Sequence, residues 1–142
     1  MGSINTRKVI VGGLVAGLVF NCIDYVVFNF ILGAQMHAEM AAISDQLVLF
    51  IDAKRALVGG IAADFVLGIA AIWVYAAIRP RYGAGAQTAV KAAAATWFIA
   101  SLAYSSYYLN RILSLELFCM LSVLGLINLV LGTLAGAKIY TE

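Results

Sequence analysis

The chain has 142 residues, of which 64% are hydrophobic and 11% are charged, and its mean hydropathy is +0.99. Soluble domains average roughly 45–50% apolar and 25% charged residues, so this composition is typical of an integral membrane protein. The length leaves room for about four spans of about 20 residues and excludes a sizeable soluble domain. The net charge of +2 is too small to indicate a nucleic-acid partner, so the lipid bilayer is the expected surrounding.

Four apolar runs of helix length follow one another, at about 9–33, 56–78, 89–109 and 117–140. The second run is expected to end at Arg79–Gln87, where the chain's only proline and two glycines predict a turn. The link between the third and fourth runs is so short that they must form an antiparallel hairpin. The runs predict an all-α fold, an integral membrane four-helix bundle, with residues 1–142 as a single transmembrane domain.

The segment between the first two runs, about 34–53, carries apolar residues at spacings of three and four: Met36, Met40, Ile43, Leu47 and Phe50. This pattern predicts an amphipathic helical segment that lies along the outer interface or folds back over the bundle. It is either a lid that covers helix ends or a methionine-bearing face that docks a partner subunit.

Lysine and arginine are distributed unevenly beside the runs. Six fall on the side of the termini, namely Arg7, Lys8, Arg79, Arg81, Lys91 and Lys138, and three fall on the other side, namely Lys54, Arg55 and Arg111. Because basic residues are enriched in cytoplasmic loops, both termini are expected in the cytoplasm.

No motif indicates catalysis. The single histidine and two cysteines have no spacing typical of a metal site, and a phosphate loop, a nucleophile elbow, a zinc-protease helix and a haem-attachment pattern are all missing. We therefore expect no metal, no cofactor and no enzymatic activity.

Two acids interrupt the apolar runs, Asp24 in the first and Asp64 in the second. Counted from the span midpoints at about 1.5 Å per residue, both are expected at one depth, slightly outside the bilayer centre. Asn21 and Asn128 fall near the centre and Tyr104 slightly further out. Since a charged side chain at the centre of a span costs about 2.5–3.5 kcal/mol, such acids are rare and are often functional.

Two interpretations of this polar layer are open. In the first, Asp24 and Asp64 form a proton- or cation-binding site, with the two asparagines and Tyr104 as neutral partners. In the second, the polar side chains hold the helices together, each hydrogen bond contributing about 0.6 kcal/mol. Small residues at four-residue spacing accompany the layer and are expected to pack helices closely: Gly13, Gly17, Gly60, Gly68, Gly125, Gly132 and Gly136.

Three stretches carry a weak resemblance to known proteins: "VGGLVAGLVFNCIDY" (Val11 to Tyr25), "WVYAAIRPRYGAG" (Trp73 to Gly85) and "GTLAGAKIY" (Gly132 to Tyr140). They resemble a loose group of small bacterial four-span membrane proteins of unknown function. The resemblance implies a bacterial inner-membrane location and four helices, and it implies no activity.

The leading interpretation is a small non-catalytic membrane protein that acts as a structural or accessory subunit, either in a homo-oligomer or in a larger membrane complex. Its small-residue faces and the amphipathic segment would then be the contact surfaces. The alternative is a small proton- or cation-linked transporter or channel that uses Asp24 and Asp64.

Overall fold

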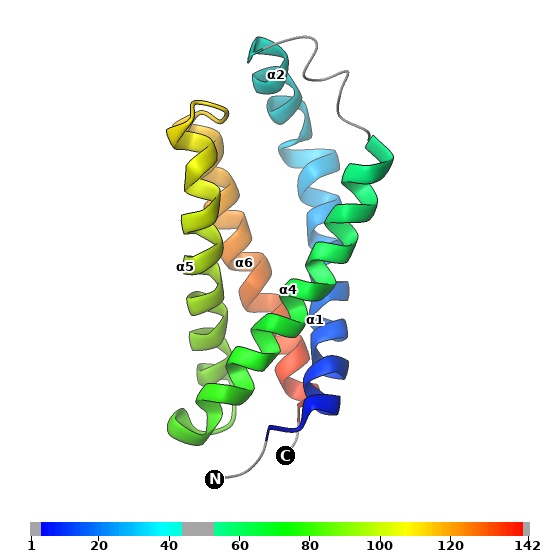
Figure 1. The fold of residues 1–142 in the computed structure, drawn as a ribbon, viewed down its shortest axis with the longest axis vertical. Coiled ribbons are helices and arrows are strands. Elements are labelled where there is room, and N and C mark those ends of the chain that lie inside the picture. Colours follow the sequence, from blue (N-terminus) through cyan, green and yellow to red (C-terminus); the bar gives the residue numbers. More distant parts are fainter. Residues whose placement is uncertain (1–3, 44–52, 141–142) are drawn as a thin grey trace.

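The computed structural model describes residues 4–43 and 53–140. All regular secondary structure in these residues is helical, which confirms the predicted all-α class. The elements are α1 (Thr6–Val26), the short π-helix η1 (Val27–Ile31), α2 (Gly33–Ile43), α4 (Ala53–Tyr82), α5 (Ala86–Leu109) and α6 (Leu115–Ile139). In Figure 1 the four long helices run alternately up and down, so that both termini lie at one end and α2 lies at the other. We call these the termini end and the α2 end.

Three helical segments are long and apolar enough to cross a membrane: Thr6–Ile31, Lys54–Tyr82 and Leu115–Ile139, each with an 18-residue stretch whose mean hydropathy is 2.0, 2.1 and 2.3 respectively. These segments contain the first, second and fourth predicted spans almost entirely. The third predicted span coincides with α5, whose sequence holds more serine, threonine and tyrosine than the other three long helices. The membrane character expected from composition therefore rests on α1, α4 and α6.

The end of α4 differs from the prediction. The helix continues through Pro80 to Tyr82 instead of ending near residue 78. Proline lacks the N–H that an interior helical position needs, but its fixed φ suits helical backbone, and Pro80 lies in the last turn. The helix ends at Gly83, which has a φ of 84° and donates its N–H to the Arg79 carbonyl at 2.8 Å. The glycine, whose missing Cβ permits this conformation, terminates the helix.

α1 lies against both α4 and α6, and glycines make these contacts close. A Cβ added at Gly17 would lie 2.7 Å from the Phe65 Cα, and one added at Gly12 would lie 2.7 Å from the Gly136 carbonyl oxygen. Gly13 and Gly68 lie in the α1–α4 contact, and Gly132 faces Phe20 in the α1–α6 contact. Helix backbones approach this closely only where side chains are small.

Two of the predicted packing glycines make no helix contact. A Cβ added at Gly60 or at Gly125 would meet nothing within 4 Å. Their four-residue spacing predicted that they pack against other helices. However, the half of α4 near the α2 end stands away from its neighbours, and Gly125 borders a cavity. Gly12, which spacing did not single out, makes the α1–α6 contact instead.

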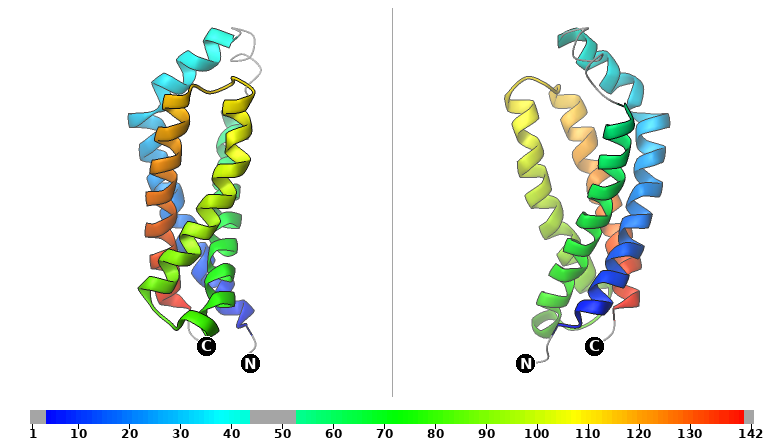
Figure 2. Two further views of the ribbon diagram at one scale, coloured as in Figure 1. Left: turned by 90° about the vertical axis from the view of Figure 1, so that its left-hand side faces the viewer. Right: turned by 45° about the vertical axis from the view of Figure 1, so that its right-hand side comes forward.

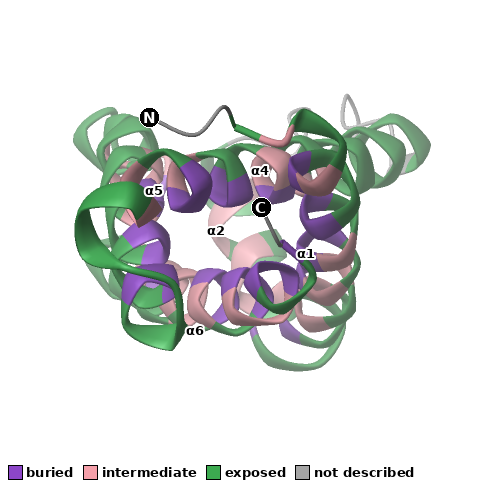
Figure 3. Ribbon diagram, turned by 90° about the horizontal axis from the view of Figure 1, so that it is seen from below, coloured by how far each residue is buried: buried purple, intermediate pink, exposed green. Residues whose placement is uncertain are grey.

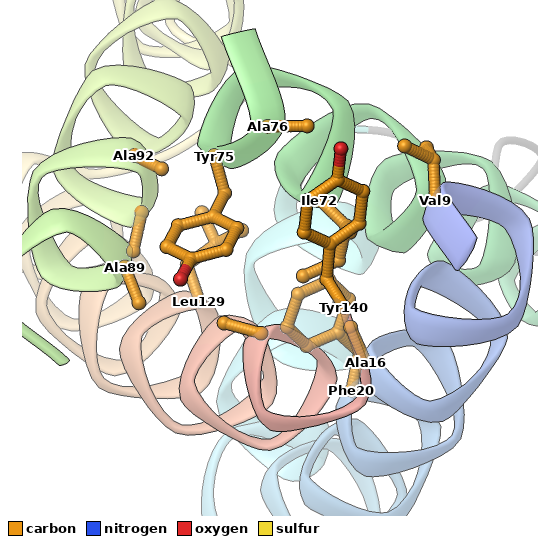
Figure 4. Packing of buried hydrophobic residues seen from close by; sticks show 12 residues of the cluster. Val9, Ala16, Phe20, Ile72, Tyr75, Ala76, Ala89, Ala92, Leu129 and Tyr140 are labelled. Carbon is orange, nitrogen blue, oxygen red and sulfur yellow. The ribbon is translucent and has the colours of Figure 1, made fainter. Parts of the chain in front are cut away.

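Buried residues line the inside of the ring formed by α1, α4, α5 and α6 (Figure 3). The larger apolar cluster fills the termini end, where Tyr75 and Tyr140 meet edge to face with centroids 6.0 Å apart (Figure 4). The Tyr75 hydroxyl accepts the Gly85 N–H, and the Tyr140 hydroxyl accepts the Asn5 N–H. Each buried phenol thus has a backbone partner at a chain turn or end, as buried tyrosines usually require.

A second, smaller cluster lies toward the α2 end and is formed by Val27, Leu32, Leu113 and Leu117. Toward the α2 end the helices diverge, as α4 and α5 do in Figure 1 and in the right-hand view of Figure 2. The fold is therefore closed at the termini end and more open at the other.

α2 is fixed to the start of α6 by Glu39. Its carboxylate accepts the Ser114 backbone N–H at 2.8 Å and the Ser114 hydroxyl at 2.6 Å, and that hydroxyl in turn accepts the Leu117 N–H. Ser114 is the N-cap of α6. In a capping box, the side chain of the third helical residue accepts the backbone N–H of the N-cap. Here that third residue is Leu117, which cannot accept, and Glu39 accepts the Ser114 N–H from another helix instead.

The predicted segment at 34–53 corresponds in part to α2. Met36 packs within the chain against the smaller cluster, so it is not available as a docking surface in this structure. Met40 is partly buried and Ile43 is exposed, whereas Leu47 and Phe50 lie outside the described residues. Met36 and the Glu39 bonds hold α2 against the start of α6, and whether the segment acts as a lid or as a docking face stays a prediction.

Candidate functional site

A cavity of about 170 Å³ lies between α1, η1, α5 and α6, at the level where the two apolar clusters separate. Its lining includes three of the five polar residues that the sequence singled out, Asp24, Tyr104 and Asn128. The other lining residues are apolar, aromatic or serine: Val27, Phe28, Trp97, Ala100, Ser101, Phe118, Leu121, Ser122, Leu124, Gly125 and Leu129. The cavity is partly open to the outside of the molecule.

Asp24 and Asn128 are in direct contact in this cavity. The Asn128 Nδ2 donates to the Asp24 Oδ1 at 2.7 Å, and a longer contact of 3.5 Å joins Nδ2 to the Phe20 carbonyl. Asn128 is only 7% exposed, and its Oδ1 is buried without a hydrogen-bond partner. A buried unpartnered carbonyl costs about 1–3 kcal/mol, so this oxygen is an open acceptor in an otherwise satisfied pair.

The antiparallel register of α1 and α6 produces this contact. Gly12 lies against Gly136, and Ala16 and Phe20 lie against Gly132. Continuing that register brings Asn128 to the level of Phe20, one helical turn from Asp24. The close glycine contacts let the two short polar side chains reach each other.

Asp64 and Asn21 do not line the cavity. Gly13 lies against Ile69 and Gly17 against Phe65, and the Asn21 Nδ2 donates to the Ile61 carbonyl at 3.4 Å. Each step of four residues up α1 therefore matches a step of four residues down α4, as expected for antiparallel helices. In this register Asp64 on α4 lies level with residue 18 on α1, which is six residues before Asp24. At 1.5 Å per residue the offset is about 9 Å.

The expectation that the two acids share a depth was therefore wrong. Span midpoints were counted from the ends of apolar runs, and they do not give the register at which α1 packs on α4, which the contacts of Gly13 and Gly17 set. Of the two acids, only Asp24 lines the cavity.

Two hydrogen bonds join α5 and α6 along the cavity wall. The Trp97 Nε1 donates to the Ser122 carbonyl at 2.8 Å, and the Ser101 and Ser122 hydroxyls lie 3.4 Å apart. The Trp97 bond fixes its indole against α6, so that this aromatic side chain borders the cavity in a defined position.

Sequence reasoning missed Trp97, Ser101, Phe118 and Ser122. The signal was present, because positions 97, 101 and 104 share one face of α5 by their spacing of four and three. Positions 118, 122 and 125 likewise share one face of α6. Since these helices form the predicted hairpin, the two faces meet.

Glu39, on α2, is a charged group outside the apolar helices. Burial by itself raises the pKa of Glu39, but the hydrogen bonds from the Ser114 N–H, the Ser114 hydroxyl and the Gln35 amide outweigh it and lower the pKa below its usual range. Glu39 is therefore held as a carboxylate at the start of α6, where the helix dipole favours negative charge.

The cavity combines one acidic side chain with apolar and aromatic walls. Its lining includes Asp24, the amide residue Asn128 and several aromatic residues, and no lysine, arginine or histidine. No three metal-ligating side chains come together in residues 4–43 and 53–140. Both cysteines are free and exposed.

Comparisons with known proteins add no family to this description. No protein-family model matches the chain, and neither the curated proteins nor the solved structures include a match.

Proposed function

We propose that the protein is a small proton- or cation-linked transporter or channel that binds its ion at Asp24. The observation that carries the proposal is the position of Asp24 on an intramembrane cavity, beside the unpartnered Oδ1 of Asn128. A carboxylate costs several kcal/mol to place in a span, and no basic side chain lines this cavity to offset that cost. A bound cation or proton would supply the missing partner.

The proposal includes a membrane domain of four spans, with α5 as the third. α5 has 24 residues, which at 1.5 Å per residue extend about 36 Å and exceed the roughly 30 Å of a bilayer core. Its one basic residue, Lys91, lies near the termini end, with its Nζ 4.3 Å from the centroid of the Tyr82 ring. A lysine there can extend to the interface while α5 crosses the bilayer as part of the α5–α6 hairpin.

We place both termini in the cytoplasm of a bacterial inner membrane. The six basic residues counted above flank the termini end of α1, α4, α5 and α6, whereas three flank the α2 end. This distribution agrees with the preference of lysine and arginine for cytoplasmic loops. The bacterial assignment rests on the resemblance of the sequence alone.

Ion flux into liposomes tests the site. Purified protein is reconstituted with a trapped pH-sensitive dye, and proton entry is followed after a membrane potential is imposed. Asp24→Asn should abolish the flux, because the amide neither titrates nor attracts a cation. Asp64→Asn is the matched control, since it removes an acid of the neighbouring helix that lies outside the cavity, and it should retain most of the flux. Equal flux in the parent protein and in Asp24→Asn would refute the proposal.

A second candidate is a non-catalytic structural or accessory subunit of a membrane complex or homo-oligomer. It is supported by the α2 end of α4, where Gly59 and Gly60 face open space beside the exposed Leu57, Val58 and Ile61. A small-residue face flanked by apolar side chains is typical of helix association in membranes. Gentle purification from native membranes tests this candidate: a stoichiometric partner or a defined oligomer supports it, and a monodisperse monomer contradicts it.

A further inference from the structure

We propose that the cavity at Asp24 binds a small lipophilic primary ammonium ion, of about the size of benzylammonium. This inference rests on the proposed function and names the chemical class of its cation. A cavity of about 150 Å³ lined by apolar side chains is known to hold one benzene molecule. The cavity here, at about 170 Å³, has room for one ring and an ammonium group.

The polar groups favour an ammonium ion with N–H donors. The Asp24 carboxylate lines the cavity, supplies the opposite charge and accepts N–H donors. The Asn128 Nδ2 donates to its Oδ1 at 2.7 Å, which holds the carboxylate in place beside the cavity. A primary ammonium has N–H groups to donate to the carboxylate, whereas a quaternary ammonium has none.

The walls favour an organic cation over a metal ion. Trp97, Tyr104 and Phe118 border the cavity, and aromatic faces attract cations while burying apolar surface. Calcium takes six to eight oxygen ligands, and magnesium keeps near-octahedral oxygen coordination. The lining offers a single carboxylate and is otherwise mostly apolar or aromatic, so it cannot replace the hydration shell of such an ion.

Tryptophan fluorescence measures this binding directly. The chain has two tryptophans, and Trp73 is exposed on α4 outside the cavity, so Trp73→Phe leaves Trp97 as the only reporter. In lipid nanodiscs, benzylammonium should change the Trp97 emission saturably. Benzyl alcohol has the same ring without the charge, and benzyltrimethylammonium has the charge without N–H donors. Both should bind at least about tenfold more weakly, since a hydrogen bond to a charged group contributes at least a tenfold change in affinity.

Two matched pairs of variants, made in the Trp73→Phe background, locate the site. Asp24→Asn should lose benzylammonium binding and Asp64→Asn should keep it. Gly125→Leu should lose binding because it projects a side chain from a cavity-lining position, while Gly60→Leu, in equally open space away from the cavity, should keep it. The Gly125 variant leaves Asp24 and Asn128 in place, and thermal unfolding should show all four variants folded.

The outcomes separate this inference from the proposed function. Absence of a saturable signal, equal binding of benzyl alcohol, or unchanged binding in Asp24→Asn would overturn the ammonium site. Proton flux that depends on Asp24 without benzylammonium binding would overturn this inference and leave the proposed function standing. Benzylammonium binding that depends on Asp24 without any flux would support the ammonium site and overturn transport.

Discussion

The contact between α1 and α4 provides the sharpest test of the packing described above. In Gly68→Ala, the new Cβ would lie 2.6 Å from the Gly17 N and would also clash with the Gly13 carbonyl oxygen. Both are backbone atoms of α1, so no side chain can rotate away. The helices must separate by several tenths of an ångström, and the glycine contacts along the pair must loosen with them.

The expected magnitude follows from two opposing effects. Overpacking a close contact costs about 1–3 kcal/mol, and the upper half of that range applies because the obstruction is backbone. Alanine regains about 0.8–1 kcal/mol over glycine through helix propensity. Gly68→Ala should therefore destabilise the protein by about 1–2 kcal/mol. Gly60→Ala, on the same helix but in open space, should only gain propensity and stabilise it by up to about 1 kcal/mol.

Equilibrium unfolding in mixed detergent micelles, followed by circular dichroism, measures both variants against the parent. Thermal midpoints in the same micelles provide a second measure. The two alanines should differ by about 2–3 kcal/mol, with opposite signs relative to the parent. If Gly68→Ala is at least as stable as Gly60→Ala, the close α1–α4 contact does not exist as described.

Three further substitutions test other parts of the fold. The pKa of Glu39 is lowered in the folded state, so the stability that its carboxylate contributes is complete above the unfolded-state pKa and is lost as pH falls through the folded-state pKa. Glu39→Gln should therefore flatten the fall of the melting temperature between about pH 6 and 3. Parallel curves of melting temperature against pH for the parent and the variant would contradict the Ser114 bonds. Arg111 has a φ of 58° at the end of α5, where glycine is usual, so Arg111→Gly should raise stability by up to about 1 kcal/mol, and a loss would contradict that conformation. The Thr133 hydroxyl is buried without a partner, so thermal unfolding of Thr133→Val should show an unchanged or slightly higher stability, and a loss of more than about 1 kcal/mol would reveal a missed hydrogen bond.

Composition and apolar periodicity predicted the helical class and the order of the long helices because these depend on local sequence. The boundaries were less certain where two local signals competed. Pro80 predicted a stop near residue 78, but the helix runs two residues past the proline, and the positive φ of Gly83 sets the end. Only the conformation of the turn decides between these two residues.

The candidate site was predictable only in part. Asp24, Asn128 and Tyr104 could be named because polar residues inside apolar runs are conspicuous. Which acid faces a cavity depends on the register between helices, and that register is set by the glycine contacts of α1 with α4 and α6. Counting from span midpoints could not supply it, so Asp64 was placed level with Asp24 when it is offset by about 9 Å.

The bond between Asp24 and Asn128 joins residues 104 positions apart, and the Glu39–Ser114 bond joins residues 75 apart. The acceptor belongs in both cases to the first part of the chain to be synthesised, and the donor to the last helix or its cap. During synthesis, α1 therefore emerges carrying an acid whose amide partner has not yet been translated. The cavity beside Asp24 is complete only once α6 has been made, so a chain that stopped before that helix would lack both a cavity wall and the amide donor.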